Sequence, residues 1–407
     1  MRVFLLESHV MKALLLENID KTAVDAFEAA GFEVDYRKGA LEGDELIQAL
    51  QDVNVVGVRS RTNLTADVIE QMPEQLVAIG AFSIGTNQIA LDAAAKRGIV
   101  CFNAPYSNTR SVVELAMGEI VVMARRLFDK SQQMHNGVWQ KSADGSHEVR
   151  GRTLGIIGYG NIGSQLSILA ESFGMNVNFY DVADKLALGN AHRCDSLEEL
   201  LSISETVSIH VDGRNENHDI FGEKEFALMP ERSLFLNLSR GFVVDEEALA
   251  ENLRSGHIAG AAVDVYHNEP KKSGDPFTNP LQGIPNVILT PHVGGSTREA
   301  QSDIGGYVSG KLIDYVRTGN TSMSVNMPKV QVQPISGHRI LHIHHNVPGV
   351  MADLNSILSN HNANIAYQAL STIGEVGFVV MDITASTPGL TKELAQVPHT
   401  IRVREVS

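Results

Sequence analysis

The sequence predicts an α/β protein with two doubly wound parallel-sheet domains, the first split along the chain, followed by a smaller ferredoxin-like α+β domain. Three observations lead to this prediction. Strand-like and helix-like segments alternate over residues 12–102, the alternation is repeated over 151–291, and residues 339–406 follow the order β-α-β-β-α-β. Regular alternation indicates parallel strands with helices on both faces of each sheet. The last order is that of a ferredoxin-like domain.

The first sheet is predicted from short apolar runs that are separated by amphipathic segments. Gly31 and Gly98 follow two of these segments, where glycine commonly ends a helix. Thr65 is a suitable N-cap for a third. The expected strands are 12–16, 32–36, 53–58, 76–82 and 99–102, and the expected helices are 20–30, 44–50, 65–72 and 91–97.

Two longer helices are expected outside that sheet. Residues 111–114 (SVVE) have the form of a capping box, and the helix from there to Met123 is apolar almost all round. Such a helix is buried, either between domains or in a subunit interface. A helix over 298–317 can return the chain to the first domain, and 320–338 has the prolines and glycines of a linker. The expected domains are 1–107 with 296–330, 108–295, and 337–407.

The last domain is expected to contain four strands and two helices. The strands are 339–345, 364–373, 376–384 and 400–406, and the helices are 350–361 and 390–396.

Residues 154–181 carry the strongest functional signal. An apolar strand ends in GYGNIG, a helical pattern follows, and a second strand closes at Asp181. In this Rossmann-like arrangement Gly158 permits a tight turn, Gly160 lets the backbone approach a pyrophosphate, and Gly163 lets helix pack on strand. Asp181 is placed to accept the hydroxyls of an adenosine ribose, and residues 182–184 supply no arginine for a 2′-phosphate. The sequence therefore predicts NAD rather than NADP.

Bulk properties narrow the class of protein. The net charge of −15 argues against nucleic acid as a general partner. Cys101 and Cys194 are expected to be small buried side chains rather than a disulfide. No apolar run of membrane-spanning length and no cleavable signal sequence is evident, so we expect a cytoplasmic protein.

Three polar residues follow strands of the second predicted sheet. Arg240, Glu269 and His292 each come just after an apolar strand, and open α/β sheets bind ligands at the carboxyl ends of their strands. A cation, a base and a carboxylate that tunes the base are what hydride transfer from a hydroxy acid requires.

The blocks NLSRGFVVDEEAL, AAVDVYHNEP and NVILTPHVGGST, together with GYGNIG, resemble the D-isomer-specific 2-hydroxyacid dehydrogenase family over residues 12–325. The resemblance implies that Arg240 binds the substrate carboxylate and C2 oxygen, and that His292 is the acid/base. Glu269 then keeps the pKa of His292 useful near neutrality, and Asp264 faces the nicotinamide side of the cofactor. The cofactor-binding residues so implied are Gly158, Gly160, Asn161, Ile162, Gly163, Asp181, Leu238, Ser239, Arg240, Asp264, His292, Gly294 and Gly295.

The blocks RSRT and NAPYSNTRSVVE resemble the branch of this family that acts on phosphoglycerate. A phosphate needs several cations, and Arg59 and Arg61 would supply them, with Ser60 and Asn108 as further substrate contacts. The alternative is that the two arginines are a solvated surface pair. Similar enzymes meet a neighbouring subunit near Trp139, which makes Lys141 a further substrate contact. The expected assembly is a homo-oligomer, a tetramer or a dimer.

The C-terminal part resembles an ACT domain through the block HIHHNVPGV. This resemblance implies an L-serine site with His344, Asn346 and Asn364. A metal site is the rival, because His342 and His344 share one face of a strand, but no cysteine or third spaced ligand supports it. We expect no metal.

The resemblance implies NAD-dependent oxidation of 3-phospho-D-glycerate to 3-phosphooxypyruvate, the first step of L-serine synthesis, with feedback by L-serine. Two alternatives remain. The chain could act on glyoxylate, 2-oxoglutarate or another 2-oxo acid, or it could be a non-enzymatic corepressor that senses NADH.

Overall fold

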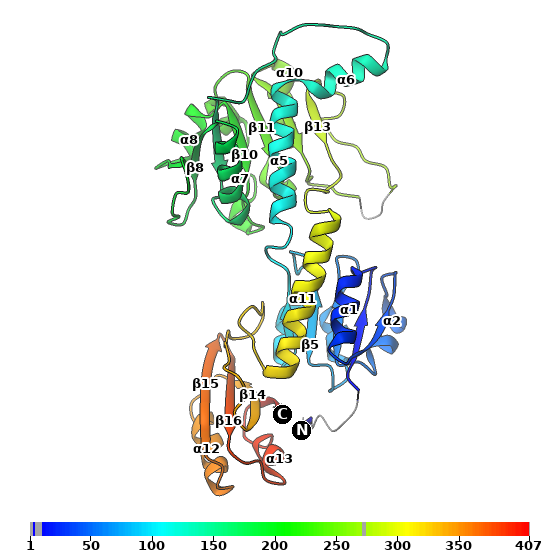
Figure 1. Ribbon diagram of the computed structural model, residues 1–407, viewed down its shortest axis with the longest axis vertical. Coiled ribbons are helices and arrows are strands. Elements are labelled where there is room, and N and C mark those ends of the chain that lie inside the picture. Colours follow the sequence, from blue (N-terminus) through cyan, green and yellow to red (C-terminus); the bar gives the residue numbers. More distant parts are fainter. Residues whose placement is uncertain (1–2, 5–9, 271–273, 407) are drawn as a thin grey trace. The chain divides into compact units, whose positions relative to one another are not determined.

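The structure is a computed structural model that describes residues 3–4, 10–270 and 274–406 (Figure 1). The opening residues 1–2 and 5–9, part of the segment considered as a signal sequence, lie outside the described residues. Contacts between Cα atoms divide the chain into two units, residues 1–107 with 301–407, and residues 108–300. No helix in the described part of the chain is long and apolar enough to cross a membrane.

The sheet of the first unit has five parallel strands in the order β3-β2-β4-β5-β6. They are β2 (Lys12–Leu15), β3 (Glu33–Tyr36), β4 (Val55–Val58), β5 (Ala78–Ala81) and β6 (Val100–Phe102). The helices are α1 (Lys21–Ala29), α2 (Gly43–Leu50), α3 (Ala66–Glu70) and α4 (Leu91–Lys96). Every residue of β4, β5 and β6 is buried, as expected for strands covered on both faces.

The long helix α11 (Arg298–Thr318) packs on this sheet along the part that belongs to the first unit. The strand residue Gly80 makes the close approach possible. A Cβ atom there would lie 2.7 Å from Leu312 and 2.8 Å from Val308. The two helix residues belong to one hydrophobic core with Phe27 and Phe102.

The second unit contains a seven-stranded parallel sheet in the order β13-β12-β11-β10-β7-β8-β9. Its strands are β7 (Thr153–Ile157), β8 (Asn176–Tyr180), β9 (His192–Arg193), β10 (Thr206–Ile209), β11 (Ser233–Asn237), β12 (Ile258–Val263) and β13 (Val287–Leu289). Its helices are α5 (Thr109–Ala124), α6 (Leu127–His135), α7 (Asn161–Ser172), α8 (Leu197–Ile203), α9 (Glu223–Leu228) and α10 (Glu246–Ser255), with 3₁₀ turns at Asn215–Asn217 and Gly241–Val243.

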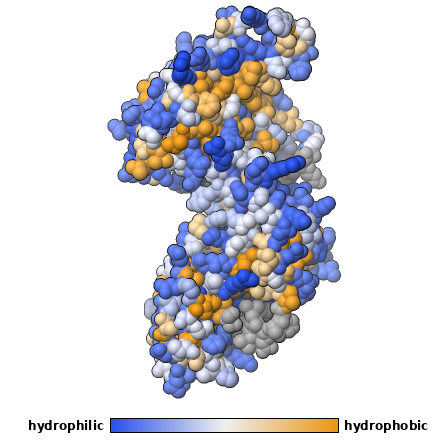
Figure 2. Space-filling view, in the orientation of Figure 1, coloured by the Kyte–Doolittle hydropathy of each residue, from blue (hydrophilic) through white to orange (hydrophobic). Residues whose placement is uncertain are grey.

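The predicted start of helix α5 was wrong. The helix begins at Thr109 with Asn108 as its N-cap, so Ser111 lies inside its first turn. The Ser111 hydroxyl is hydrogen-bonded instead to the Thr297 hydroxyl, with 2.8 Å between the oxygens. The expected apolar character is present, and Figure 2 shows hydrophobic side chains gathered over the part of the second unit where α5 and α7 lie.

Helix α6 was not predicted, because it has no buried residue and hence no apolar face to give a periodic pattern. Leu127, Phe128 and Met134 are exposed on it, and Trp139 beyond it is 79% exposed.

The C-terminal sheet has the strand order β1-β17-β14-β16-β15. It contains β14 (His338–His345), α12 (Val350–Asn360), β15 (Ile365–Ile373), β16 (Val376–Ile383), α13 (Leu390–Leu394) and β17 (Thr400–Val406). The strands β15, β16 and β14 are antiparallel to their neighbours, so the predicted fold class is confirmed. The additional strand β1 (Val3–Phe4) pairs parallel to β17. It was not predicted, because a strand of two residues is too short to give a pattern in the sequence.

Candidate active site

The loop between β7 and α7 has the form that a dinucleotide phosphate requires. Gly158 has φ +89°, and a Cβ atom there would lie 2.4 Å from the His210 carbonyl oxygen. A Cβ atom on Gly163 would lie 2.2 Å from the Gly158 carbonyl oxygen, whereas one on Gly160 would meet nothing within 4 Å. Two glycines therefore close the turn, and the third leaves open space at the N-terminus of α7 (Asn161, Ile162), where helix N–H groups favour a pyrophosphate.

Asp181 lies directly after β8, beside that loop. Its carboxylate accepts hydrogen bonds from the backbone N–H groups of Tyr159 and Ala183, both at 2.8 Å. These bonds fix the orientation of a carboxylate that is only partly buried. The residues present thus fit an adenosine ribose with free hydroxyls.

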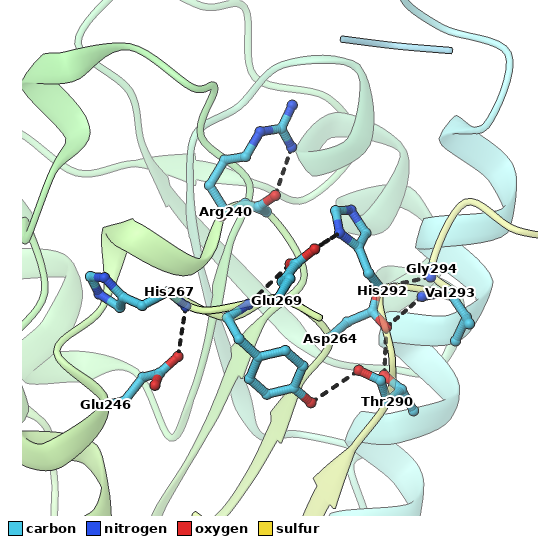
Figure 3. Close-up of polar contacts among 11 residues, drawn as sticks. Arg240, Glu246, Asp264, His267, Glu269, Thr290, His292, Val293 and Gly294 are labelled. Atoms are coloured by element: carbon cyan, nitrogen blue, oxygen red, sulfur yellow. Dashed lines mark hydrogen bonds and ion pairs between the residues drawn. The ribbon is translucent and has the colours of Figure 1, made fainter. Parts of the chain in front are cut away.

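Three neighbouring strands, β11, β12 and β13, bring the predicted acid/base residues to one edge of the sheet. Figure 3 shows Glu269, from the loop after β12, pointing towards His292, from the loop after β13. The His292 Nδ1 lies 2.9 Å from Glu269 Oε2 and 3.1 Å from Oε1. The structure therefore brings these two predicted residues into direct contact.

The contact sets the proton affinity of both groups. The hydrogen bond that Glu269 accepts from His292 raises the pKa of His292 above its ordinary value, against the lowering effect of burial. Burial would raise the pKa of Glu269, but the hydrogen bond and charge of His292, with smaller contributions from Tyr266 and Arg240, lower it. His292 keeps 52% of its side chain exposed, so its other ring nitrogen is accessible to a ligand.

His292 also has an unusual backbone conformation, with φ +53°. The left-handed region is uncommon for a residue with a β-carbon and occurs more often at functional sites. The conformation is held by Asp264, which is 2% exposed. Its carboxylate accepts bonds from the N–H groups of Val293 (2.8 Å) and Gly294 (2.7 Å) and from the Thr290 hydroxyl (2.6 Å). Asp264 therefore fixes both sides of the loop that carries His292 (Figure 3).

The loops after β11 and β12 are in close contact. A Cβ atom on Gly241 would lie 2.0 Å from the Tyr266 carbonyl carbon, a distance that no side chain can occupy. Tyr266 in turn binds Glu269 Oε1 through its backbone N–H at 3.2 Å, and its hydroxyl donates to the Thr290 carbonyl at 3.0 Å. The positions of Arg240 and Glu269 are thereby coupled through the backbone.

Arg240 itself lies in the loop after β11, and one of its terminal nitrogens donates to the Ser239 carbonyl at 2.7 Å. In Figure 3 its guanidinium is directed away from the Glu269–His292 pair. Leu238 and Ser239 are buried between this arginine and β11, and Asn237 accepts a bond from the Ser239 N–H at 3.1 Å.

One buried acid of this region was missed by the sequence analysis. Glu119, in the middle of α5, is 5% exposed, and neither carboxyl oxygen has a hydrogen-bond partner in the structure. Burial, and secondarily the charge of Asp264, raises its pKa to about 8. The carboxyl group is therefore largely uncharged at neutral pH. A glutamate within an apolar helical stretch is the sequence signal that could have identified it.

The predicted substrate contacts lie in two different units. Arg59, Ser60 and Arg61 follow β4 in the first unit, with Ser60 and Arg61 exposed. Asn108 lies at the start of the second unit, where its side chain occupies the space next to Gly295. Lys141 is exposed in the segment after α6. Glu17, Tyr266, Gly241 and Thr290 were not singled out from the sequence, because their roles depend on which loops meet.

The residues predicted to bind L-serine also differ in exposure. His344 is buried in β14 with its Nδ1 atom 3.3 Å from that of His342. Asn346 and Asn364 are exposed, and the Asn346 amide donates to the Gly374 carbonyl at 3.2 Å. Within the part of the chain that the structure describes, no group of three or more His, Cys, Asp or Glu side chains could hold a metal ion.

Comparison with known proteins identifies the family. Residues 117–294 match the family described as "D-isomer specific 2-hydroxyacid dehydrogenase, NAD binding domain", and residues 340–404 match an "AHAS small subunit-like ACT domain". The chain is 50% identical over 403 residues to D-3-phosphoglycerate dehydrogenase of Escherichia coli (strain K12), with 98% of each chain covered. The chain belongs to the D-isomer-specific 2-hydroxyacid dehydrogenase family. NAD is therefore its cofactor, as predicted.

Other members of the family agree with this assignment. D-3-phosphoglycerate dehydrogenase of Dictyostelium discoideum is 45% identical over 397 residues, covering 97% of each chain. Among solved structures, D-lactate dehydrogenase from Aquifex aeolicus, complexed with NAD and lactic acid, is 25% identical. Its TM-score is 0.66, and the match covers 78% of this chain and 100% of that one.

Proposed function

We propose that this chain is an NAD-dependent enzyme that oxidises 3-phospho-D-glycerate to 3-phosphooxypyruvate, the first step of L-serine synthesis. The observation that carries the proposal is the 50% identity, over 98% of each chain, to a D-3-phosphoglycerate dehydrogenase. The paired His292 and Glu269 support it, because they provide a general base with a raised pKa.

In the proposed reaction His292 removes the proton of the C2 hydroxyl through its exposed ring nitrogen. Glu269 accepts the hydrogen bond from Nδ1 and stabilises the imidazolium that results. Arg240 binds the substrate carboxylate and C2 oxygen, so that the bond to be broken is oriented. The β7–α7 loop and Asp181 would hold NAD, which would supply the hydride acceptor for C2. Asp264 keeps the His292 loop in its unusual conformation throughout.

Replacing Glu269 with glutamine should shift the pH dependence of the oxidation. The base must be neutral, so kcat/KM rises as the pH increases through the pKa of His292. Glu269 raises that pKa, and its neutral replacement moves the acid limb to lower pH while the plateau falls about 10²-fold through loss of charge stabilisation. A pH–rate profile of both proteins measures the shift. An unmoved limb contradicts the proposed pairing. The control is Glu246→Gln, because the Glu246 carboxylate accepts a hydrogen bond from the His267 backbone N–H rather than from His292.

Substrate phosphate is assigned to Arg59 and Arg61, with Ser60, Asn108 and Lys141 as further contacts. A 2-hydroxy acid without phosphate needs neither arginine. NADH formation measured with 3-phosphoglycerate and with glycerate therefore tests the proposed substrate. The Arg59→Ala/Arg61→Ala variant should raise the KM for 3-phosphoglycerate by about 10²–10⁴-fold, since each of the two lost charge-assisted bonds is worth about 1.5–3 kcal/mol.

The matched control is Arg150→Ala/Arg193→Ala, which removes the same charge from exposed sites of the second unit. Equal turnover of glycerate and 3-phosphoglycerate by the native protein would favour the alternative, another 2-hydroxy acid. Binding of NADH without any turnover would favour the non-enzymatic reading.

We further infer that residues 1–107 with 296–330 bind substrate, that 108–295 bind NAD, and that 337–407 regulate. The match of residues 340–404 to an ACT domain supports the last role. L-serine is the proposed effector, at His344, Asn346 and Asn364, and adding it to the same assay should reduce NADH formation. The exposed side chains around α6 and Trp139 support a homo-oligomer, a tetramer or a dimer. The cytoplasm is the proposed location.

A further inference from the structure

The loop that carries Arg59 and Arg61 is organised around a single carboxylate, that of Glu17. Four consecutive backbone N–H groups point at it. Those of Arg59 and Thr62 donate to Oε1 at 3.1 and 2.9 Å, and those of Ser60 and Arg61 donate to Oε2 at 3.1 and 2.9 Å. Successive N–H groups converging on one point form a concave anion-binding site, of the kind that holds phosphates in other proteins.

Glu17 is itself fixed in place. It follows β2, has φ +64°, and its N–H donates to the Gly39 carbonyl at 3.0 Å. The next residue, Asn18, also has a positive φ of +54° and donates to the Arg37 carbonyl at 3.3 Å. Both residues are in the left-handed region, which costs free energy for non-glycine residues. This turn directs the Glu17 side chain inwards, where it is 3% exposed.

Other contacts show that the loop is held on more than one side. The Gln88 side-chain amide donates to the Arg59 carbonyl, and the buried Thr62 hydroxyl accepts the Leu41 N–H at 3.4 Å. The Arg61 Nε atom lies 3.8 Å from Glu17 Oε2, close enough for its charge to be attracted without a direct hydrogen bond. The Arg61 side chain remains 61% exposed.

The charge of Glu17 is well compensated in this environment. Burial would raise its pKa, but the backbone N–H groups of Thr62, Arg61 and Arg59 and the Thr62 hydroxyl outweigh burial and lower it. A carboxylate that accepts several backbone bonds stays ionised. The backbone site of this loop is therefore already filled by an anion of the chain itself, so an external anion would be bound by the side chains of the loop, with Arg59 and Arg61 as its cations.

We propose that Glu17 is a positioning residue for phosphate recognition: by occupying the backbone N–H groups of residues 59–62, it holds the loop so that the Arg59 and Arg61 side chains bind the substrate phosphate. This inference rests on the proposed function. Glu17 touches neither substrate nor cofactor, and it acts only through the two arginines. Its loss should therefore affect recognition of the phosphate and leave the hydride-transfer residues of the second unit unchanged.

The test is Glu17→Gln, which keeps the shape but replaces one acceptor oxygen with a donor. We expect the KM for 3-phosphoglycerate to rise about tenfold or more, because a displacement of about 1 Å can cost up to 10²-fold. The KM for NAD should stay within about twofold. In the Arg59→Ala/Arg61→Ala background the same substitution should change the KM by less than about twofold, because residues that act through each other are not additive. Glu42→Gln, at an exposed glutamate that makes no cap bond to α2, is the matched control.

Two further measurements keep the proposal testable if Glu17→Gln does not fold. Amide hydrogen exchange of the native protein should be slow at residues 59–61, although two of the three are exposed, and rapid exchange there would overturn the proposal. Glu17→Asp keeps the charge with a shorter reach and should show a smaller rise in the same KM. An equal effect of Glu17→Gln with and without the arginines would also overturn the proposal. A native protein that does not oxidise 3-phosphoglycerate would instead refute the proposed function.

Discussion

Replacing His292 with glutamine is expected to lower kcat for 3-phosphoglycerate oxidation by about 10²–10⁴-fold, the usual contribution of a positioned general base. Glutamine can still donate a hydrogen bond to Glu269, so the loop after β13 keeps its partner. It cannot accept the C2 hydroxyl proton, and the barrier to hydride transfer rises accordingly. Because the backbone bonds to Asp264 remain, NADH affinity should change little. Stopped-flow turnover and fluorescence titration of NADH separate the two effects.

His192→Gln provides the matched control, because His192 is an exposed histidine of the same unit on the far edge strand β9. It should leave kcat unchanged. A His292→Gln variant with native kcat would show that another group removes the proton. A variant that loses NADH binding to the same extent as activity would show that His292 mainly supports the cofactor loop.

Replacing Arg240 with alanine is expected to lower kcat/KM by about 10²–10³-fold, because it removes the cation assigned to the substrate carboxylate and C2 oxygen. Charge-assisted bonds to carboxylate are among the strongest polar contacts, and truncating one partner of a buried charge pair costs about 2–5 kcal/mol. Lysine restores the charge without the planar fork, so Arg240→Lys should recover only part of the loss. Steady-state kinetics with 3-phosphoglycerate measures both variants.

Arg214→Ala is the control for Arg240, since Arg214 is an exposed arginine that pairs with Asp212, a carboxylate whose pKa Arg240 also lowers. Its removal changes the charge nearby without touching the proposed carboxylate contact. If both alanine variants lose the same activity, the effect is one of general charge rather than of a specific bond. If Arg240→Lys is fully active, bidentate binding is not required.

The sequence was sufficient to predict the order of strands and helices over residues 12–102 and in the last domain, because buried strands leave apolar runs and glycine often follows a helix. It was not sufficient where a short element depends on a distant partner. Strand β1 pairs with β17, and the hydroxyl of Ser111, expected to cap α5, is hydrogen-bonded instead to that of Thr297. Neither partner is near in sequence.

The candidate site shows the same limit. His292 and Glu269 lie in loops after neighbouring strands, so topology made their proximity plausible, and the resemblance to the family implied their contact. The hydrogen-bonding environments of Glu17 and Glu119 could not be predicted in this way, because each depends on what surrounds the carboxyl group in three dimensions. The Glu17 carboxylate accepts hydrogen bonds from a loop more than forty residues away in the sequence, whereas the Glu119 carboxyl group has no hydrogen-bond partner. Sequence position alone does not distinguish these two environments.

The contact of Gly241 with Tyr266 has a consequence for how this enzyme can diversify. No β-carbon fits at residue 241, so the loop of Arg240, the residue proposed to bind the substrate carboxylate, and the loop of Glu269, the hydrogen-bond partner of His292, cannot move independently. Any change in one loop is transmitted to the other, and about 1 Å of error can cost 10²-fold in rate. New substrate preferences should therefore arise from residues outside these two loops, while the spacing between them stays fixed.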